Sequence, residues 1–182
     1  MLAVKTVQIR LERLSAWDFG YAVNLAIVAL ITYALISSIT PLLVNRPAEP
    51  IGILWAVISA VFVVKDTREH SLSAGISRLV STCVSAALCL VYLLFLPANP
   101  LGMAILISIG TLLMMLAGRR DEINLVAITT AVILIVATEN PLTAWQQPLL
   151  RLADSAAGVA VGIACKWIAS FLFFQIRGRE AR

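Results

Sequence analysis

Residues 19–44, FGYAVNLAIVALITYALISSITPLLV, decide the class of fold, because they run for 26 residues without a charged side chain. At 1.5 Å per residue, a helix of this length exceeds the roughly 30 Å hydrocarbon core of a bilayer. The apolar core of a secretory signal peptide has only about 7–15 residues. The stretch therefore predicts an uncleaved, membrane-spanning helix near the N-terminus.

Five further apolar segments follow, separated by prolines, a glycine and charged residues. The six predicted spans cover residues 19–44, 51–64, 79–96, 101–117, 123–138 and 152–174. Of the 182 residues, 60% are hydrophobic and 13% are charged, whereas soluble domains have about 25% charged residues. We predict an all-α, polytopic membrane protein with six transmembrane helices in one domain.

The predicted domains are a segment at 1–18, the transmembrane domain at 19–174 and a basic cytoplasmic tail at 175–182. Apolar side chains recur at helical spacing near the N-terminus, with basic residues on the other faces. This pattern is typical of an amphipathic helix on the membrane surface. An ordinary cytoplasmic extension fits the same residues equally well.

Basic residues gather on one side of the predicted membrane. With six spans, that side receives both termini and the loops at 65–78 and 118–122, and it holds 11 of the 14 Lys and Arg residues. Cytoplasmic loops carry such an excess of positive charge. We therefore expect both termini in the cytoplasm. We further predict that the spans lie in the cell inner membrane. The dispersed charge offers no basic patch for nucleic acid.

The sequence contains a weak copy of itself. WAVISAVFVV at 55–64 is similar to VAITTAVILI at 126–135, and RLVST at 78–82 is similar to RLADS at 151–155. Three spans separate the copies, so they cross the membrane in opposite directions. This is the 3+3 inverted repeat of many transporters. Chance similarity between apolar helices is the alternative.

The first span of each copy is short, with 14 residues at 51–64 and 16 at 123–138. Such helices reach only about 21 and 24 Å. Short segments in matching positions indicate a binding site near the membrane midplane. In the alternative interpretation, the polar residues that follow extend each helix by a turn.

The ionisable groups near the spans are mostly basic, which favours an anionic cargo. Lys166 lies inside the last span and either faces a polar cavity or extends its stem to the interface. Arg78, with Lys65 near it, has no acidic neighbour and offers a bidentate donor to an organic anion or to lipid phosphate. Arg151 and Asp154 share one helical face and can pair, which either anchors the last span or orients a substrate contact.

Three hydroxyls in the short spans are candidates for hydrogen bonds to a carboxylate: Ser59, Thr129 and Thr130. They equally suit bridges between helices or bonds to their own backbone carbonyls. Trp55 suits either stacking on an aromatic ring or anchoring at the membrane interface. The sequence shows no metal-ligand cluster, phosphate-binding loop or nucleophile motif, so we expect neither an enzyme nor a bound metal or cofactor.

The motifs at 55–64, 78–82, 127–132 and 151–158 resemble the fusaric acid resistance (FUSC) superfamily of membrane proteins, over about residues 20–174. This group includes aromatic acid exporters and is related to plant aluminium-activated malate transporters. The resemblance implies export of aromatic or dicarboxylic acids. Arg78, Lys65 and Lys166 would attract the anion, and the three hydroxyls would line its passage. Alternatives are a passive anion channel of the same architecture and a membrane scaffold that transports nothing.

Two departures from the family pattern matter. The family usually carries glycine where Ser81 stands in this sequence, which affects the packing of the third span. Many relatives also contain a second membrane module or a soluble domain, and these 182 residues contain neither. By analogy, the resemblance implies that a single module assembles as a homodimer surrounded by membrane lipid.

Overall fold

The computed structural model describes residues 16–44, 50–65, 67–139 and 141–180. Helices make up nearly all of this part of the chain, which contains no strand: α1 (Ala16–Val44), α2 (Pro50–Val63), α3 (Arg68–Phe95), α4 (Pro100–Leu116), α5 (Ile123–Glu139) and α6 (Gln147–Glu180), with short 3-10 helices η1 (Arg120–Glu122) and η2 (Pro141–Gln146). The all-α prediction is confirmed, and each predicted span overlaps one α-helix. The predicted amphipathic helix lies almost wholly outside the described residues.

Four stretches of the described chain are long and apolar enough to cross a membrane. They are Phe19–Thr40 in α1, Arg68–Phe95 in α3, Arg120–Glu139 in η1 and α5, and Pro141–Phe171 in η2 and α6. The apolar helices α2 and α4 are shorter, with 14 and 17 residues. At 1.5 Å per residue, α2 reaches about 21 Å. The chain is a multi-pass membrane protein, and six complete crossings stay a prediction.

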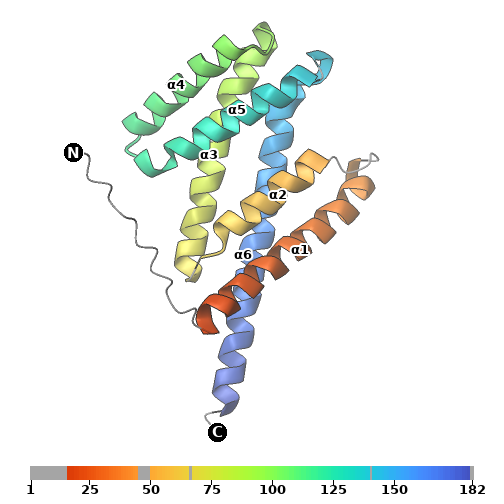
Figure 1. Ribbon diagram of the computed structural model, residues 1–182, viewed down its shortest axis with the longest axis vertical. Helices are drawn as coiled ribbons and strands as arrows, with labels where there is room; N and C mark the ends of the chain where they lie inside the picture. Colours follow the sequence, from red (N-terminus) through yellow and green to blue (C-terminus); the bar gives the residue numbers. More distant parts are fainter. Residues whose placement is uncertain (1–15, 45–49, 66, 140, 181–182) are drawn as a thin grey trace, which may run out of the picture.

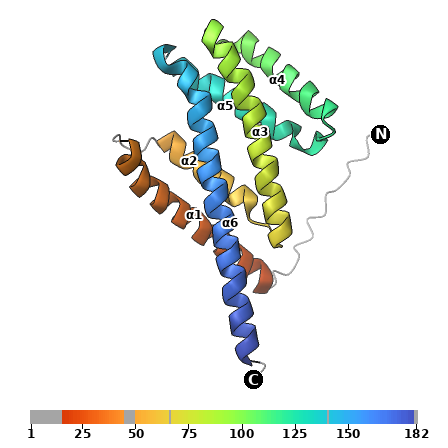
Figure 2. The same ribbon diagram turned by 180° about the vertical axis from the view of Figure 1, so that it is seen from behind.

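The helices form a central pair flanked by two oblique pairs (Figures 1 and 2). The long helices α3 and α6 pack against each other at the centre. On one side α1 packs on α2, which in turn packs on α6, and on the other side α4 packs on α5, which packs on α3. Each oblique pair thus rests on the central helix that comes from the other half of the sequence.

Two glycines of α6 permit its close approach to α2. A Cβ atom on Gly158 would lie 2.1 Å from the backbone oxygen of Ala56, and one on Gly162 would lie 2.7 Å from that of Ala60. Any larger side chain at these positions would overlap the neighbouring backbone. Small residues allow this kind of direct backbone contact between membrane helices, and here they fix the position of α2 on α6.

The structure corrects the predicted boundaries of the third span. Helix α3 begins at Arg68 rather than at residue 79, because Thr67 caps it by accepting a hydrogen bond from the His70 amide at 3.2 Å. Glu69 in the first turn complements the helix dipole. Most of the predicted 65–78 loop is therefore helix, and Arg78 lies about 15 Å along α3. Since α2 ends at Val63, these polar residues lengthen α3 and not α2.

Candidate functional site

Helix α3 directs Arg78 against one face of α2. The guanidinium carbon of Arg78 lies 5.2 Å from the ring centroid of Trp55 and 5.5 Å from that of Phe62. Between the rings, the Nε atom donates a long hydrogen bond of 3.4 Å to the Ser59 hydroxyl. Trp55, Ser59 and Phe62 share one face of α2 because they are spaced at i, i+4 and i+7. We call these four residues the Arg78 cluster.

The charge of Arg78 is buried without a carboxylate to neutralise it. The residue is 2% exposed, and no acidic group of the described chain lies within ion-pair distance of it. Aromatic ring faces attract a cation by about 0.5–2 kcal/mol, but they accept no strong N–H hydrogen bond. The Nη2 atom is buried with no hydrogen-bond partner in the described residues. The cluster therefore offers a fixed positive charge and an unsatisfied donor.

Arg151 has the opposite environment. It is 1% exposed and lies inside α6, which begins at Gln147, not in the predicted loop before residue 152. Its Nη1 atom lies 3.3 Å from the Oδ2 atom of Asp154, so the ion pair predicted from their spacing is confirmed. The Asp154 carboxylate in turn packs on α2, because its oxygens would lie 3.1 and 3.2 Å from a Cβ atom on Gly52.

The other candidate residues lie on several elements. Thr129 and Thr130 are buried on α5, where Thr130 lies beside the Cys89 thiol. The Thr129 hydroxyl finds no hydrogen-bond partner in the part of the chain that the structure describes. Lys65 is exposed just beyond the end of α2, and Lys166 is half-buried on α6. Of the predicted set, Trp55 and Ser59 are the residues shown in contact with Arg78.

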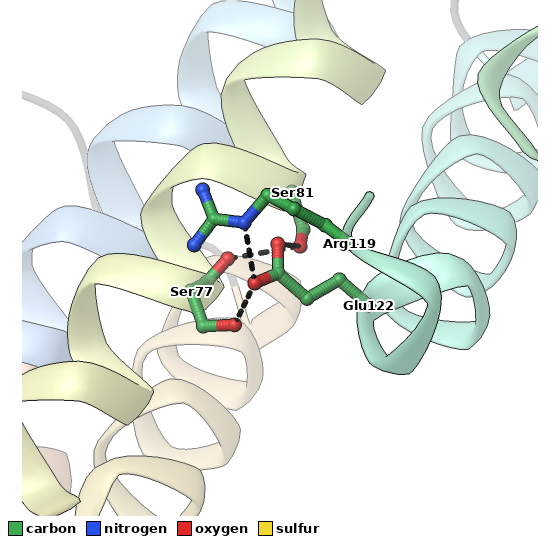
Figure 3. A network of polar contacts seen from close by, with 4 residues as sticks. All are labelled: Ser77, Ser81, Arg119 and Glu122. Atoms are coloured by element: carbon green, nitrogen blue, oxygen red, sulfur yellow. Dashed lines mark hydrogen bonds and ion pairs between the residues drawn. The ribbon is translucent and has the colours of Figure 1, made fainter. Parts of the chain in front are cut away.

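A second polar cluster, which the sequence did not indicate, surrounds Glu122 (Figure 3). This residue is 7% exposed. Its Oε1 atom accepts a hydrogen bond from the Ser77 hydroxyl and lies 2.9 Å from the Arg119 Nε atom. Its Oε2 atom accepts from the Ser81 hydroxyl at 3.2 Å. We call Ser77, Ser81, Arg119 and Glu122 the Glu122 network.

The residues missed from the sequence differ in how they could have been found. Phe62 follows Trp55 by two helical turns, so the apolar spacing of α2 already places both rings on one face. Glu122 follows Arg119 by three positions, the same spacing that predicted the ion pair in α6, so this ion pair could have been found, but its contacts with the serines could not. Its serine partners are 45 and 41 positions away in the chain, and the 3-10 turn that carries it has no hydrophobic pattern.

Comparison with known protein families gives a match over most of the described helices. A family model described as fusaric acid resistance protein-like matches residues 35–165. This range extends from the second half of α1 well into α6 and includes both buried arginines. A search of curated protein sequences and a search of solved structures each find no significant match.

Proposed function

Because the chain belongs to the fusaric acid resistance protein-like family, a family of membrane transporters, we propose that it exports organic anions across the cell inner membrane. Aromatic and dicarboxylic acids are the proposed cargo. Both termini lie in the cytoplasm in this proposal, in keeping with the excess of basic residues in the segments assigned to that side.

The observation that carries the proposal is the environment of Arg78. A buried cation in a membrane protein is costly, and such residues commonly mark substrate or ion pathways. The guanidinium supplies charge-assisted hydrogen bonds to a carboxylate, which are the strong ones. Its Nη2 atom has no acceptor within the described chain. A carboxylate ligand would supply both the missing charge and the missing acceptor.

The two rings of the cluster suit an organic anion better than a small inorganic one. Trp55 is almost fully buried, whereas Phe62 is half-exposed. Both rings flank the guanidinium, so a carboxylate held by Arg78 would place its carbon skeleton beside apolar surface. Burial of that skeleton contributes about 25 cal/mol per Å². Ser59, on the same face, would add a hydroxyl contact.

We further infer a 3+3 inverted repeat, in which α1, α2 and α3 correspond to α4, α5 and α6. The packing supports it: α1 lies on α2 as α4 lies on α5, and α2 lies on α6 as α5 lies on α3. Transport sites in such folds lie near the midplane at the interface of the repeats. Thr129 and Thr130 on α5 would then line the passage with Ser59 on α2. By family analogy, the working unit is a homodimer.

In this proposal Lys65 and Lys166 extend the path from Arg78 towards the cytoplasm, and the pair of Arg151 and Asp154 lies on the exit side of Arg78. Lys65 and Lys166 would attract the anion before it reaches the Arg78 cluster, since clefts lined by one sign of charge concentrate ions of the other. Arg151 would lie at the exit, where Asp154 sets its orientation. Export coupled to protons or to a second anion is compatible with these groups.

The test is flux into proteoliposomes containing the full chain, with radiolabelled phthalate as the aromatic acid and succinate as the dicarboxylic acid. Wild type, Arg78→Gln and Arg78→Lys are compared, with Arg120→Gln as a control at an exposed arginine. We expect saturable flux that Arg78→Gln lowers at least about tenfold and that Arg120→Gln preserves. Equal flux in wild type and Arg78→Gln would overturn the proposal.

The same assay separates the two alternatives. Flux that exceeds carrier turnover and appears as macroscopic current would indicate a passive channel. Wild-type protein that is folded, correctly inserted and inactive towards both acids would favour a scaffold role.

A further inference from the structure

The Glu122 network joins elements from the two halves of the chain. Ser77 and Ser81 belong to α3, whereas Arg119 and Glu122 precede α5. Three contacts converge on one buried carboxylate, and two of them cross between the halves. Hydrogen bonds to an ionised group are about twice as strong as neutral ones. The network therefore fixes the start of α5 against α3.

This joint differs in kind from the contact between α2 and α6. There, the contact at Gly158 and Gly162 is made directly between the backbones of the two helices. The Glu122 network instead uses groups that water can replace, and Arg119 is already 36% exposed. Exchange of a hydrogen bond to a charged group for bonds to water costs about 1.5–3 kcal/mol of net free energy. A joint of this type can open and reclose.

The serine side of the joint has a means of release. The Ser81 hydroxyl lies 2.9 Å from the Ser77 backbone oxygen as well as 3.2 Å from the Glu122 carboxylate. Its single proton can turn to its own helix when Glu122 leaves, so no orphaned donor results.

The network is also linked to the Arg78 cluster through α3. Ser77 immediately precedes Arg78, so the serine faces η1 while the arginine faces α2. A rotation or shift of α3 against α2 that breaks the serine contacts would also move the guanidinium relative to Trp55. One helix thus carries residues of both the Glu122 network and the Arg78 cluster.

We propose that the Glu122 network is a latch that closes one end of the anion pathway and opens once in each transport cycle. This inference rests on the proposed function. The second pair of the same spacing, Arg151 with Asp154, lies at the start of α6, separated from the latch by the length of α5. This second pair would keep the opposite end of the anion pathway closed, where α6 packs on α2.

The experiment cross-links the two sides of the latch, α3 and η1, reversibly. Ser81→Cys and Glu122→Cys are combined in a background in which Cys83, Cys89 and Cys165 are replaced by serine, and a short, reducible bis-thiol reagent joins them. Succinate flux is measured in proteoliposomes before linking, after linking and after reduction. Each single-cysteine variant, treated identically, is the matched control.

We expect linking to lower succinate flux at least about tenfold, because it prevents a required conformational step, and reduction to restore it. The linking reagent should leave the flux of each single-cysteine control at the value measured for that variant before treatment. Full flux in the linked protein would overturn the latch, as would failure of the two cysteines to link. If the unlinked background transports no anion although wild type does, the Cys89 replacement is reverted before the comparison. If wild type itself transports nothing, the proposed function fails instead.

A second measurement does not depend on flux. Ser77→Cys is labelled with a membrane-impermeant thiol reagent, alone and together with Glu122→Gln, which retains the shape of the side chain but loses the ion pair with Arg119. We expect Glu122→Gln to raise the labelling rate about tenfold, equivalent to roughly 1.4 kcal/mol of lost closure. An unchanged rate would contradict a latch held by Glu122.

Discussion

Arg78 and Arg151 occupy matching positions in the two similar segments of the chain, RLVST and RLADS, yet their environments differ. Both are at most 2% exposed. Arg151 pairs with Asp154 three residues later, whereas Arg78 packs between Trp55 and Phe62. Burial is therefore common to both arginines, and the available counter-charge is what distinguishes them.

The residue three positions after each arginine accounts for the difference. In the second segment that residue is Asp154, which neutralises Arg151. In the first it is Ser81, whose hydroxyl turns to Glu122 and its own helix. The first segment thus leaves its arginine without a carboxylate and uses the matching position to close a contact with η1.

The largest effect is expected for Arg151→Gln. Loss of one partner from a buried ion pair leaves the other charge uncompensated and costs about 3–5 kcal/mol. We expect Arg151→Gln to lower the free energy of unfolding by an amount at or below the lower end of this range, since the Asp154 side chain is 22% exposed. Denaturant unfolding in detergent measures it. In the double variant Arg151→Gln/Asp154→Asn most of the loss should be recovered, and a double variant as unstable as the single one would show that the pair is not the cause.

Arg78→Gln should lower anion flux without lowering the stability of the protein. Because it removes a buried charge that has no carboxylate partner, we expect an unchanged or higher unfolding temperature. Anion flux should fall roughly 10- to 150-fold, equivalent to the 1.5–3 kcal/mol of hydrogen bonds to a charged group. Unfolding and flux are measured on the same preparations. A loss of stability as large as that of Arg151→Gln would place Arg78 with the structural arginines.

Trp55→Leu tests the contact between the Trp55 ring and the first of the two arginines, Arg78. Leucine keeps apolar bulk against Arg78 but lacks the ring face, which contributes about 0.5–2 kcal/mol to such a contact. We expect succinate flux at subsaturating concentration to fall roughly two- to thirtyfold. Leu54→Ala, at an exposed position of the same helix, is the control. Wild-type flux in Trp55→Leu would mean that the ring does not position the guanidinium.

Ser59→Ala should have the smallest effect. Its hydrogen bond with Arg78 is long, at 3.4 Å, and such bonds are weak. We expect a change in flux of about twofold or less, equivalent to at most about 0.5 kcal/mol. A loss as large as that of Arg78→Gln would instead identify the hydroxyl as a direct ligand of the anion.

The sequence predicted those parts of the fold that depend on apolar runs and on the residues that interrupt them. Apolar runs bounded by proline and glycine located a helix for every predicted span, and the spacing of Arg151 and Asp154 predicted their ion pair. The start of α3 was not predicted, because its first turns are polar and depend on the Thr67 cap and on packing against α6. A hydropathy profile shows neither the cap nor the packing.

Three of the four residues of the Arg78 cluster were candidates from the sequence, but their mutual contact was not predicted. Arg78, Trp55 and Ser59 were each identified from the sequence, whereas their contact depends on how α2 crosses α3. The Glu122 network was not anticipated at all. It joins residues more than 40 positions apart, and such pairs arise only from tertiary packing.

The most direct test of the central claim, that the guanidinium of Arg78 binds the carboxylate of the cargo, is stabilisation by ligand. Thermal unfolding of wild type, Arg78→Lys and Arg78→Gln in lipid nanodiscs is followed over a series of phthalate and succinate concentrations. At a hundred times Kd, a bound ligand adds about 2.7 kcal/mol to stability. The account predicts a saturable rise in unfolding temperature for wild type, a weaker rise for Arg78→Lys and none for Arg78→Gln. An equal rise in Arg78→Gln over the same concentrations would contradict it.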